Sequence, residues 1–222
     1  ESLNDYRGKP LAYRSAPHGD MHLDILDLPK LERSQVILPP RDLEAIEHHT
    51  LGISSQSEVL LNAGRHLRRG LLLYGPPGTG KTMSVMYLCN RMPERTTVVI
   101  NGGPSISQLG QAMSLARSLE PSMVVIEDVD LIAQNRANPN QETNPLLFQL
   151  LNEMDNVPEQ SDVIFVLTTN RLDLLEPALA ARPGRIDHAV EVDLPDAECR
   201  RRLFDLYLRG IDTGALEIDT VI

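Results

Sequence analysis

Tryptophan is absent from the 222 residues, aromatic side chains make up only 4% of them, and there are two cysteines. Cys89 and Cys199 lie far apart and fit neither a disulfide framework nor a metal site, so we expect two free thiols in a reducing compartment. No apolar run approaches the roughly 20 residues of a membrane-spanning helix, and the N-terminus has no secretory apolar segment. We therefore predict a cytoplasmic protein with no membrane segment in this chain.

Positive charge is also scarce, because 21 lysines and arginines face 31 acidic residues and give a net charge of −10 and a pI near 5.0. Such a surface repels a phosphate backbone, which argues against a nucleic-acid partner. The length and the hydrophobic content of 41% suit one main domain with a full-sized core. The chain begins with Glu1 rather than Met, so we expect it to be part of a longer protein.

Five short apolar runs, separated by segments long enough for helices, predict a sheet. The runs are Gly70–Tyr74, Thr97–Ile100, Met123–Ile126, Val163–Thr168 and Ala189–Val192. Continuous rather than alternating apolar strands are typical of a parallel sheet buried on both faces. We expect helices at Thr82–Asn90, Ile106–Leu119 and Pro145–Asp155. The predicted fold is therefore α/β, with a five-stranded, mainly parallel sheet flanked by helices.

The segments on either side of the sheet differ in composition. Residues 1–40 mix acidic, proline and short apolar pieces without a period, which indicates an N-terminal arm or linker, or the tail of an upstream domain. Residues 41–195 form the predicted large α/β domain, with two short helices before its first strand. Ala197–Leu208 has the pattern of an amphipathic helix, so residues 196–222 are predicted to start a small helical lid.

A glycine-rich loop directly after the first predicted strand matches the phosphate-binding pattern G-x-x-x-x-G-K-[ST] in full. Its residues are Gly75, Pro76, Pro77, Gly78, Thr79, Gly80, Lys81 and Thr82. The glycines allow successive N–H groups to converge on phosphate oxygens, and the helix that follows adds its positive end. We expect Lys81 to reach the β- and γ-phosphates and Thr82 to bind Mg²⁺. A chance glycine-rich turn is the alternative, which the flanking strand and helix disfavour.

Acidic residues end the third apolar run, where Met123–Ile126 is followed by Glu127, Asp128 and Asp130. Carboxylates at the carboxyl end of a neighbouring parallel strand lie beside a phosphate loop, in the crevice where such sheets bind ligands. There one acid can hold the magnesium shell while its neighbour polarises the attacking water. Exposed acids that merely terminate a strand are the alternative interpretation.

The spelling Gly-Pro-Pro-Gly-Thr-Gly-Lys-Thr is usual in the AAA family of ATPases, which the chain resembles from Leu43 to Leu208. The resemblance implies ATP and Mg²⁺ as cofactors. In that family the acidic strand ends Asp-Glu-x-Asp, with the first acid serving the metal and the second serving as base. By position, Glu127 takes the metal role and Asp128 the base role. Each exchange moves a carboxylate by one methylene, and catalysis is sensitive to shifts of about 1 Å, so we expect tight ATP binding and slow turnover.

The fourth run ends in Asn170, where the family places a residue that contacts the γ-phosphate or orients the lytic water. In isolation, an Asn that begins a turn would be the simpler interpretation. The stretch from Leu174 to Asp187 then resembles the family's Arg-Pro-Gly-Arg signature, with one extra residue before the first arginine. The resemblance implies that Arg182 and Arg185 project into the ATP site of a neighbouring subunit, in a ring homo-oligomer that is usually a hexamer.

Three features depart from the family pattern. The segment 101–110 holds no aromatic residue where unfoldase members carry a gripping loop, so Gly102-Gly103 is equally well a pore loop or a plain turn. The upstream adenine-pocket segment has only a partial match, at 51–53. The six histidines show no site spacing, and we expect most of them to be exposed.

Together these features predict an AAA-type ATPase that binds and hydrolyses ATP with Mg²⁺ in a ring and remodels a protein partner. Asp128, Asn170, Arg182 and Arg185 are the predicted catalytic residues, and Thr82 and Glu127 the metal ligands. Two alternatives remain open. One is a slow-hydrolysing ATP-dependent switch or scaffold, which the acid order favours. The other is a nucleic-acid motor, which the negative charge disfavours.

Overall fold

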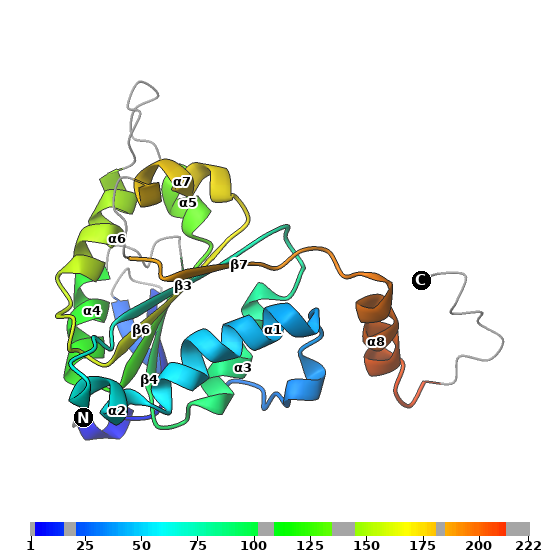
Figure 1. Ribbon diagram of the computed structural model, residues 1–222, viewed down its shortest axis with the longest axis horizontal. Helices are drawn as coiled ribbons and strands as arrows, with labels where there is room; N and C mark the ends of the chain where they lie inside the picture. Colours follow the sequence, from blue (N-terminus) through cyan, green and yellow to red (C-terminus); the bar gives the residue numbers. More distant parts are fainter. Residues whose placement is uncertain (1–2, 16–20, 102–108, 135–144, 181–184, 212–222) are drawn as a thin grey trace.

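The computed structural model describes residues 3–15, 21–101, 109–134, 145–180 and 185–211. Its centre is one twisted sheet of seven strands in the order β2-β1-β4-β5-β6-β3-β7 (Figure 1). Every neighbouring pair is parallel except β1 and β2, which are antiparallel. The strands are β1 (Pro10–Ser15), β2 (Met21–Ile25), β3 (Arg69–Tyr74), β4 (Thr96–Asn101), β5 (Ser122–Glu127), β6 (Val163–Thr169) and β7 (His188–Glu191). The predicted α/β class and mainly parallel sheet are confirmed.

The sheet has two strands more than the five expected, and both come from the segment interpreted as an arm. The strand β1 joins β4 through a short parallel ladder from Pro10–Thr97 to Ala12–Val99, and β2 folds back on β1. The sequence did not reveal them because each strand is short and the partner of β1 lies more than 80 residues away. The predicted boundaries at residues 40 and 195 stay predictions.

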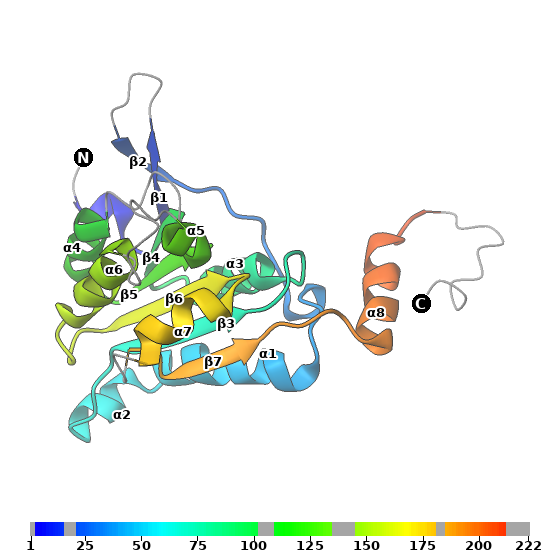
Figure 2. The ribbon, with the colours of Figure 1, turned by 90° about the horizontal axis from the view of Figure 1, so that it is seen from above.

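Helices cover both faces of the sheet (Figures 1 and 2). They are the short helices η1 (Leu3–Tyr6), η2 (Arg33–Gln35) and η3 (His48–Gly52), and α1 (Pro40–Glu47), α2 (Ser57–Asn62), α3 (Lys81–Arg91), α4 (Leu109–Ser118), α5 (Val129–Gln134), α6 (Pro145–Asp155), α7 (Leu172–Ala180) and α8 (Ala197–Tyr207). Side chains of α4, α5, α6 and α7 form one apolar core, and those of α1 and α3 form another.

The strand β5 shows why the central runs are apolar throughout. Val124 and Ile126 belong to the core under α4 to α7, whereas Met123 and Val125 belong to the core under α1 and α3. Successive side chains of a strand point to opposite faces, so a strand covered on both faces needs apolar residues at every position. The expected continuous pattern is therefore explained by the two cores.

The helix α8 stands apart from the sheet at the end of a long connection (Figures 1 and 2). It begins where the Asp196 carboxylate accepts a hydrogen bond of 2.7 Å from the Cys199 N–H, which caps the first turn. Tyr207 near its end is 70% exposed. None of the helices in the described ranges is long and apolar enough to cross a membrane.

Three histidines, for which the sequence showed no site spacing, meet beside the start of β7. The rings of His49 and His188 stack with centroids 3.9 Å apart and 14° between their planes. His48 places its ring edge-on to His49 at 5.3 Å. Burial, followed by His188 and His48, lowers the pKa of His49 from its ordinary value of 6.5, and the nearby Asp187 opposes the shift. The stack therefore favours the neutral form of the His49 imidazole.

Acidification is expected to destabilise the protein through this stack. Because the pKa of His49 is lower in the folded than in the unfolded chain, its contribution to stability is present above pH 6.5 and is lost as the pH falls below that value. His49→Phe keeps an aromatic ring that does not titrate, so its free energy of unfolding should fall less between about pH 7.5 and pH 5. Urea denaturation at each pH measures this. His66→Gln, at an exposed histidine, should behave like the native protein, and an identical pH dependence in His49→Phe would contradict the prediction.

Candidate nucleotide site

The predicted site residues come from three strands that end at the same edge of the sheet. The phosphate loop follows β3, the acids follow β5, and Asn170 follows β6. The strand β6 lies between the other two and is parallel to both. The carboxyl ends of all three strands therefore meet, as expected for a ligand crevice of an α/β sheet.

The glycines of the phosphate loop are required by its path. At Gly75, φ is +146°, and a Cβ atom would lie 2.2 Å from the Val192 carbonyl oxygen of the neighbouring chain segment. Gly80 has φ of +105° directly before the first residue of α3. Other residues rarely adopt such conformations, so the loop depends on glycine at both positions.

Lys81 is buried inside the loop that precedes it, with 7% of its surface exposed. Its ammonium donates hydrogen bonds to the carbonyl oxygens of Gly75 at 2.8 Å and Pro76 at 2.7 Å. Burial lowers the pKa of Lys81, while the charges of Asp128 and Asp130 oppose the shift. An ammonium bonded to neutral carbonyls in a cradle of backbone N–H groups suits a phosphate anion.

Glu127 and Thr82 form the part of the site that fits a divalent cation. The Glu127 Oε1 atom is buried and has no hydrogen-bond partner within the described part of the chain. Burial raises the pKa of Glu127, a hydrogen bond from Thr82 opposes this, and Asp128 adds to it. A buried oxygen without a partner is costly, and Mg²⁺ takes carboxylate and hydroxyl oxygens as ligands. These two residues therefore fit the predicted metal.

Asp128 and Asn170 lie together, each at the end of its strand. The Asn170 amide donates from Nδ2 to the Asp128 carboxylate at 3.4 Å. Asp128 has φ of +52°, which places a residue other than glycine in the left-handed region. Its N–H donates to the Thr168 hydroxyl at 3.0 Å. The carboxylate and the amide predicted to act on one water therefore share a corner of the site.

Of the two predicted arginines, Arg185 is not at this edge of the sheet. Arg182 lies outside the described residues. Arg185 precedes β7, at the opposite end of the sheet. The length of β3 separates it from the loop, which corresponds to about 20 Å. There its guanidinium donates to the Leu151 carbonyl oxygen at 3.3 Å and forms an ion pair with Asp155 at the end of α6. Arg185 thus cannot reach the phosphate loop of its own subunit.

A small cavity of about 120 Å³ beside the loop is suited to the base of a nucleotide. It is lined by residues 35–39, by Gly78 to Gly80, and by Leu203 and Tyr207 of α8. The partial match at 51–53 is instead part of η3 and the turn that follows it, under α1. The sequence contained a signal for the segment that lines this cavity, because Val36-Ile37-Leu38 is an apolar run shortly before α1.

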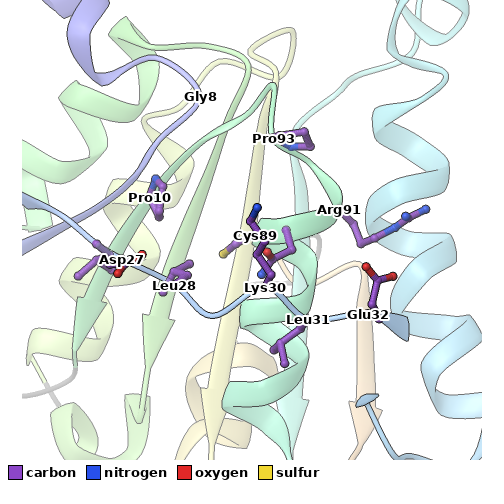
Figure 3. Close-up of a pocket in the computed structure, with 12 residues that line it drawn as sticks. Gly8, Pro10, Asp27, Leu28, Lys30, Leu31, Glu32, Cys89, Arg91 and Pro93 are labelled. Atoms are coloured by element: carbon purple, nitrogen blue, oxygen red, sulfur yellow. The ribbon is translucent and has the colours of Figure 1, made fainter. Parts of the chain in front are cut away.

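Two larger hollows lie along α3. One of about 510 Å³ lies between the segment 26–32 and the C-terminal end of α3, as Figure 3 shows for Leu28, Cys89 and Arg91. Another of about 400 Å³ shares Leu28 and Cys89 with it and extends to Thr82 and Glu127. Burial raises the pKa of the Cys89 thiol to about 11, which favours the protonated thiol over the thiolate. The larger of these two hollows is separate from the phosphate loop, and the second reaches the side of the loop where Thr82 and Glu127 lie.

A parallel α/β sheet with this loop after β3 and these acids after β5, on the other side of β6, defines a P-loop nucleoside triphosphate-binding protein. Residues 71–194 match the sequence profile of the "ATPase family associated with various cellular activities (AAA)". The match covers more than half of the chain, and the chain belongs to this family. The predicted resemblance is confirmed, and with it the nucleotide-binding character of the fold.

Curated relatives agree with this family. The chain is 38% identical to the 26S proteasome regulatory subunit 6B homolog of Encephalitozoon cuniculi over 68% of its length and 41% of that protein. It is 36% identical to ATP-dependent zinc metalloprotease FtsH 2 of Sphaerobacter thermophilus, over 66% of the chain and 24% of the relative. It is 34% identical to the proteasome-activating nucleotidase of Archaeoglobus fulgidus, over 68% and 41%. The chain thus spans less than half the length of these relatives.

Proposed function

We propose that the protein is an ATPase that binds ATP with Mg²⁺, hydrolyses it within a ring of subunits, and uses the cycle to remodel a protein partner. The observation that carries this proposal is the meeting of three groups at one sheet edge. These groups are the buried Lys81 ammonium, the unpartnered Glu127 oxygen and the contact between Asp128 and Asn170. They supply a phosphate anchor, a metal ligand and a water-activating pair.

Each residue has a distinct role in this proposal. The loop from Gly75 to Thr82 holds the phosphates, and the cavity beside Val36 to Pro39 receives the base. Thr82 and Glu127 hold Mg²⁺, which supplies charge neutralisation at the phosphates when it is bound. Asp128 accepts a proton from the attacking water, and Asn170 orients that water.

The ring and the protein partner are supported by Arg185 and by the relatives. Arg185 lies at the far edge from its own loop, which suits a residue that serves the site of the next subunit. Two of the relatives are named for the proteasome and one as an ATP-dependent protease, so proteins are the substrate class that we propose. Six subunits is the number that the family resemblance implies.

A slow-hydrolysing switch or scaffold is the second candidate function. It is favoured by the reversed acid order, which alters the position of the base carboxylate by one methylene. The steady-state rate of ATP hydrolysis by the complete protein separates the two functions. A motor that remodels proteins turns over repeatedly, whereas a switch stays loaded with ATP.

Lys81→Ala in the complete protein tests the site itself. Removing one member of a buried charge pair costs about 2–5 kcal/mol of binding, so ATP affinity should fall by about 30-fold or more. Titration with ATP followed by calorimetry measures this. Lys30→Ala, at an exposed lysine on the segment that crosses α3, is the matched control and should bind ATP normally. Native affinity in Lys81→Ala would sink the proposal.

A further inference from the structure

Asp130 is a buried acid that the proposed chemistry does not use. It lies in the first turn of α5, two residues beyond Asp128, and only 4% of its surface is exposed. Its Oδ1 atom accepts a hydrogen bond of 2.9 Å from the Thr169 hydroxyl and another of 3.0 Å from the Asn170 N–H. A carboxylate this deeply buried is retained only where its hydrogen bonds offset the cost of leaving water.

These bonds continue the link between β5 and β6 beyond the point where the strands separate. The backbone ladder ends at Ile126 and Leu167, because Asp128 turns into the left-handed region. Beyond that point, the Thr168 hydroxyl accepts a hydrogen bond from the Asp128 N–H. The Asp130 carboxylate accepts hydrogen bonds from the Thr169 hydroxyl and the Asn170 N–H. Side chains thus replace the ladder at the point where the proposed base and the water-orienting amide are attached.

The network also reaches the phosphate loop. The Thr169 carbonyl oxygen accepts a hydrogen bond of 3.3 Å from the Gly75 N–H, the first residue of the loop. The Thr169 hydroxyl accepts a hydrogen bond from the Arg171 N–H at 3.0 Å. Through Thr169, Asp130 therefore connects the ends of three strands that carry the acids, the amide and the loop.

The backbone of Asp128 explains why such an anchor is needed. A residue other than glycine in the left-handed region is held there only when the surrounding contacts determine it. Asp128 is held directly by its own N–H bond to Thr168, and two residues further on the Asp130 side chain ties the start of α5 to Thr169 and Asn170. Without the second anchor, Asp128 can relax toward an unstrained φ, which moves its carboxylate away from Asn170.

We propose that Asp130 is a positioning residue for ATP hydrolysis, which holds the Asp128 carboxylate and the Asn170 amide in register across β5 and β6. The inference rests on the proposed function, since it assigns a role relative to the proposed base. It depends on the acceptor atom Oδ1 rather than on the charge. Asn keeps that acceptor and Leu does not, so the two replacements separate geometry from charge.

The test compares Asp130→Leu, Asp130→Asn and Thr169→Val in the complete protein, with kcat, KM for ATP and thermal midpoint measured for each. Displacing the base by about 1 Å should lower kcat about 100-fold in Asp130→Leu with little change in KM, while Asp130→Asn loses less than about tenfold. Thr169→Val keeps the Asn170 bond and should lose about tenfold. Val124→Ala, a core change on β5, is the control for a purely structural loss.

A kcat loss in Asp130→Leu no larger than in Val124→Ala at the same thermal midpoint would overturn the inference. An equal and large loss in Asp130→Asn would also overturn it, because the acceptor is then not what matters. If Asp130→Leu does not fold, Thr169→Val decides, and an unchanged kcat there refutes the role. Failure of the proposed function itself would look different, since Lys81→Ala would then also leave ATP binding intact.

Discussion

Asp128→Asn is expected to lower kcat about a thousandfold while ATP still binds with nearly native affinity. The replacement keeps the shape of the side chain and an oxygen that can accept from Asn170, but it cannot take a proton from water. The Lys81 ammonium stays in place, so the phosphates are still held. The variant should therefore accumulate bound, unhydrolysed ATP, which single-turnover assays with labelled ATP would detect.

Glu127→Gln is the matched control for this prediction. It changes the neighbouring acid, whose Oε1 atom is the proposed metal ligand, and it should raise the Mg²⁺ concentration needed for half-maximal rate. If Asp128→Asn retained more than about a tenth of the native kcat while Glu127→Gln lost nearly all of it at saturating Mg²⁺, the base would be Glu127. The reversed acid order would then have exchanged the two roles rather than displaced them.

The sheet was largely predictable because burial on both faces imposes a local pattern. Each of the five expected runs is a strand to within one or two residues, and α6 spans Pro145–Asp155 as predicted. The chain segments that form β1 and β2 lack such a pattern, because β2 lies at the edge of the sheet. Their pairing depends on a partner far along the sequence, which no local period reports.

In the candidate site, too, the features encoded by local sequence were predictable and those that depend on long-range contacts were not. The phosphate loop and the acids were predictable because a motif encodes them within a few residues. The cavity proposed to receive the base was not, since Val36 and Leu38 approach Gly80 only after folding. The stack of His49 on His188 and the bonds of Asp130 likewise join residues more than 35 positions apart. Tertiary packing, rather than local sequence, creates these contacts.

Arg185→Ala is expected to lower kcat by about a thousandfold or more in the complete protein, with ATP affinity nearly unchanged. In the isolated subunit, Arg185 is paired with Asp155, and the two side chains are 14% and 36% exposed. Taking the mostly buried guanidinium out of water offsets much of the attraction within the pair, so the guanidinium can exchange this carboxylate for a phosphate of the next subunit. Arg65→Ala, at an exposed arginine, is the control and should retain the native kcat.

Mixing subunits shows whether Arg185 acts across an interface. Lys81→Ala subunits lack a phosphate anchor but carry Arg185, whereas Arg185→Ala subunits have the opposite defect. In an equal random mixture, about one site in four has an intact loop beside an intact arginine, so two inactive proteins should together regain about a quarter of the native rate.

A mixture no more active than its separate components would mean that Arg185 does not serve a neighbouring site. If Arg185 acted only within its own subunit, mixing could not restore activity, because neither variant chain holds both an intact loop and an intact arginine. The experiment therefore decides between a site completed by the next subunit and one confined to a single chain.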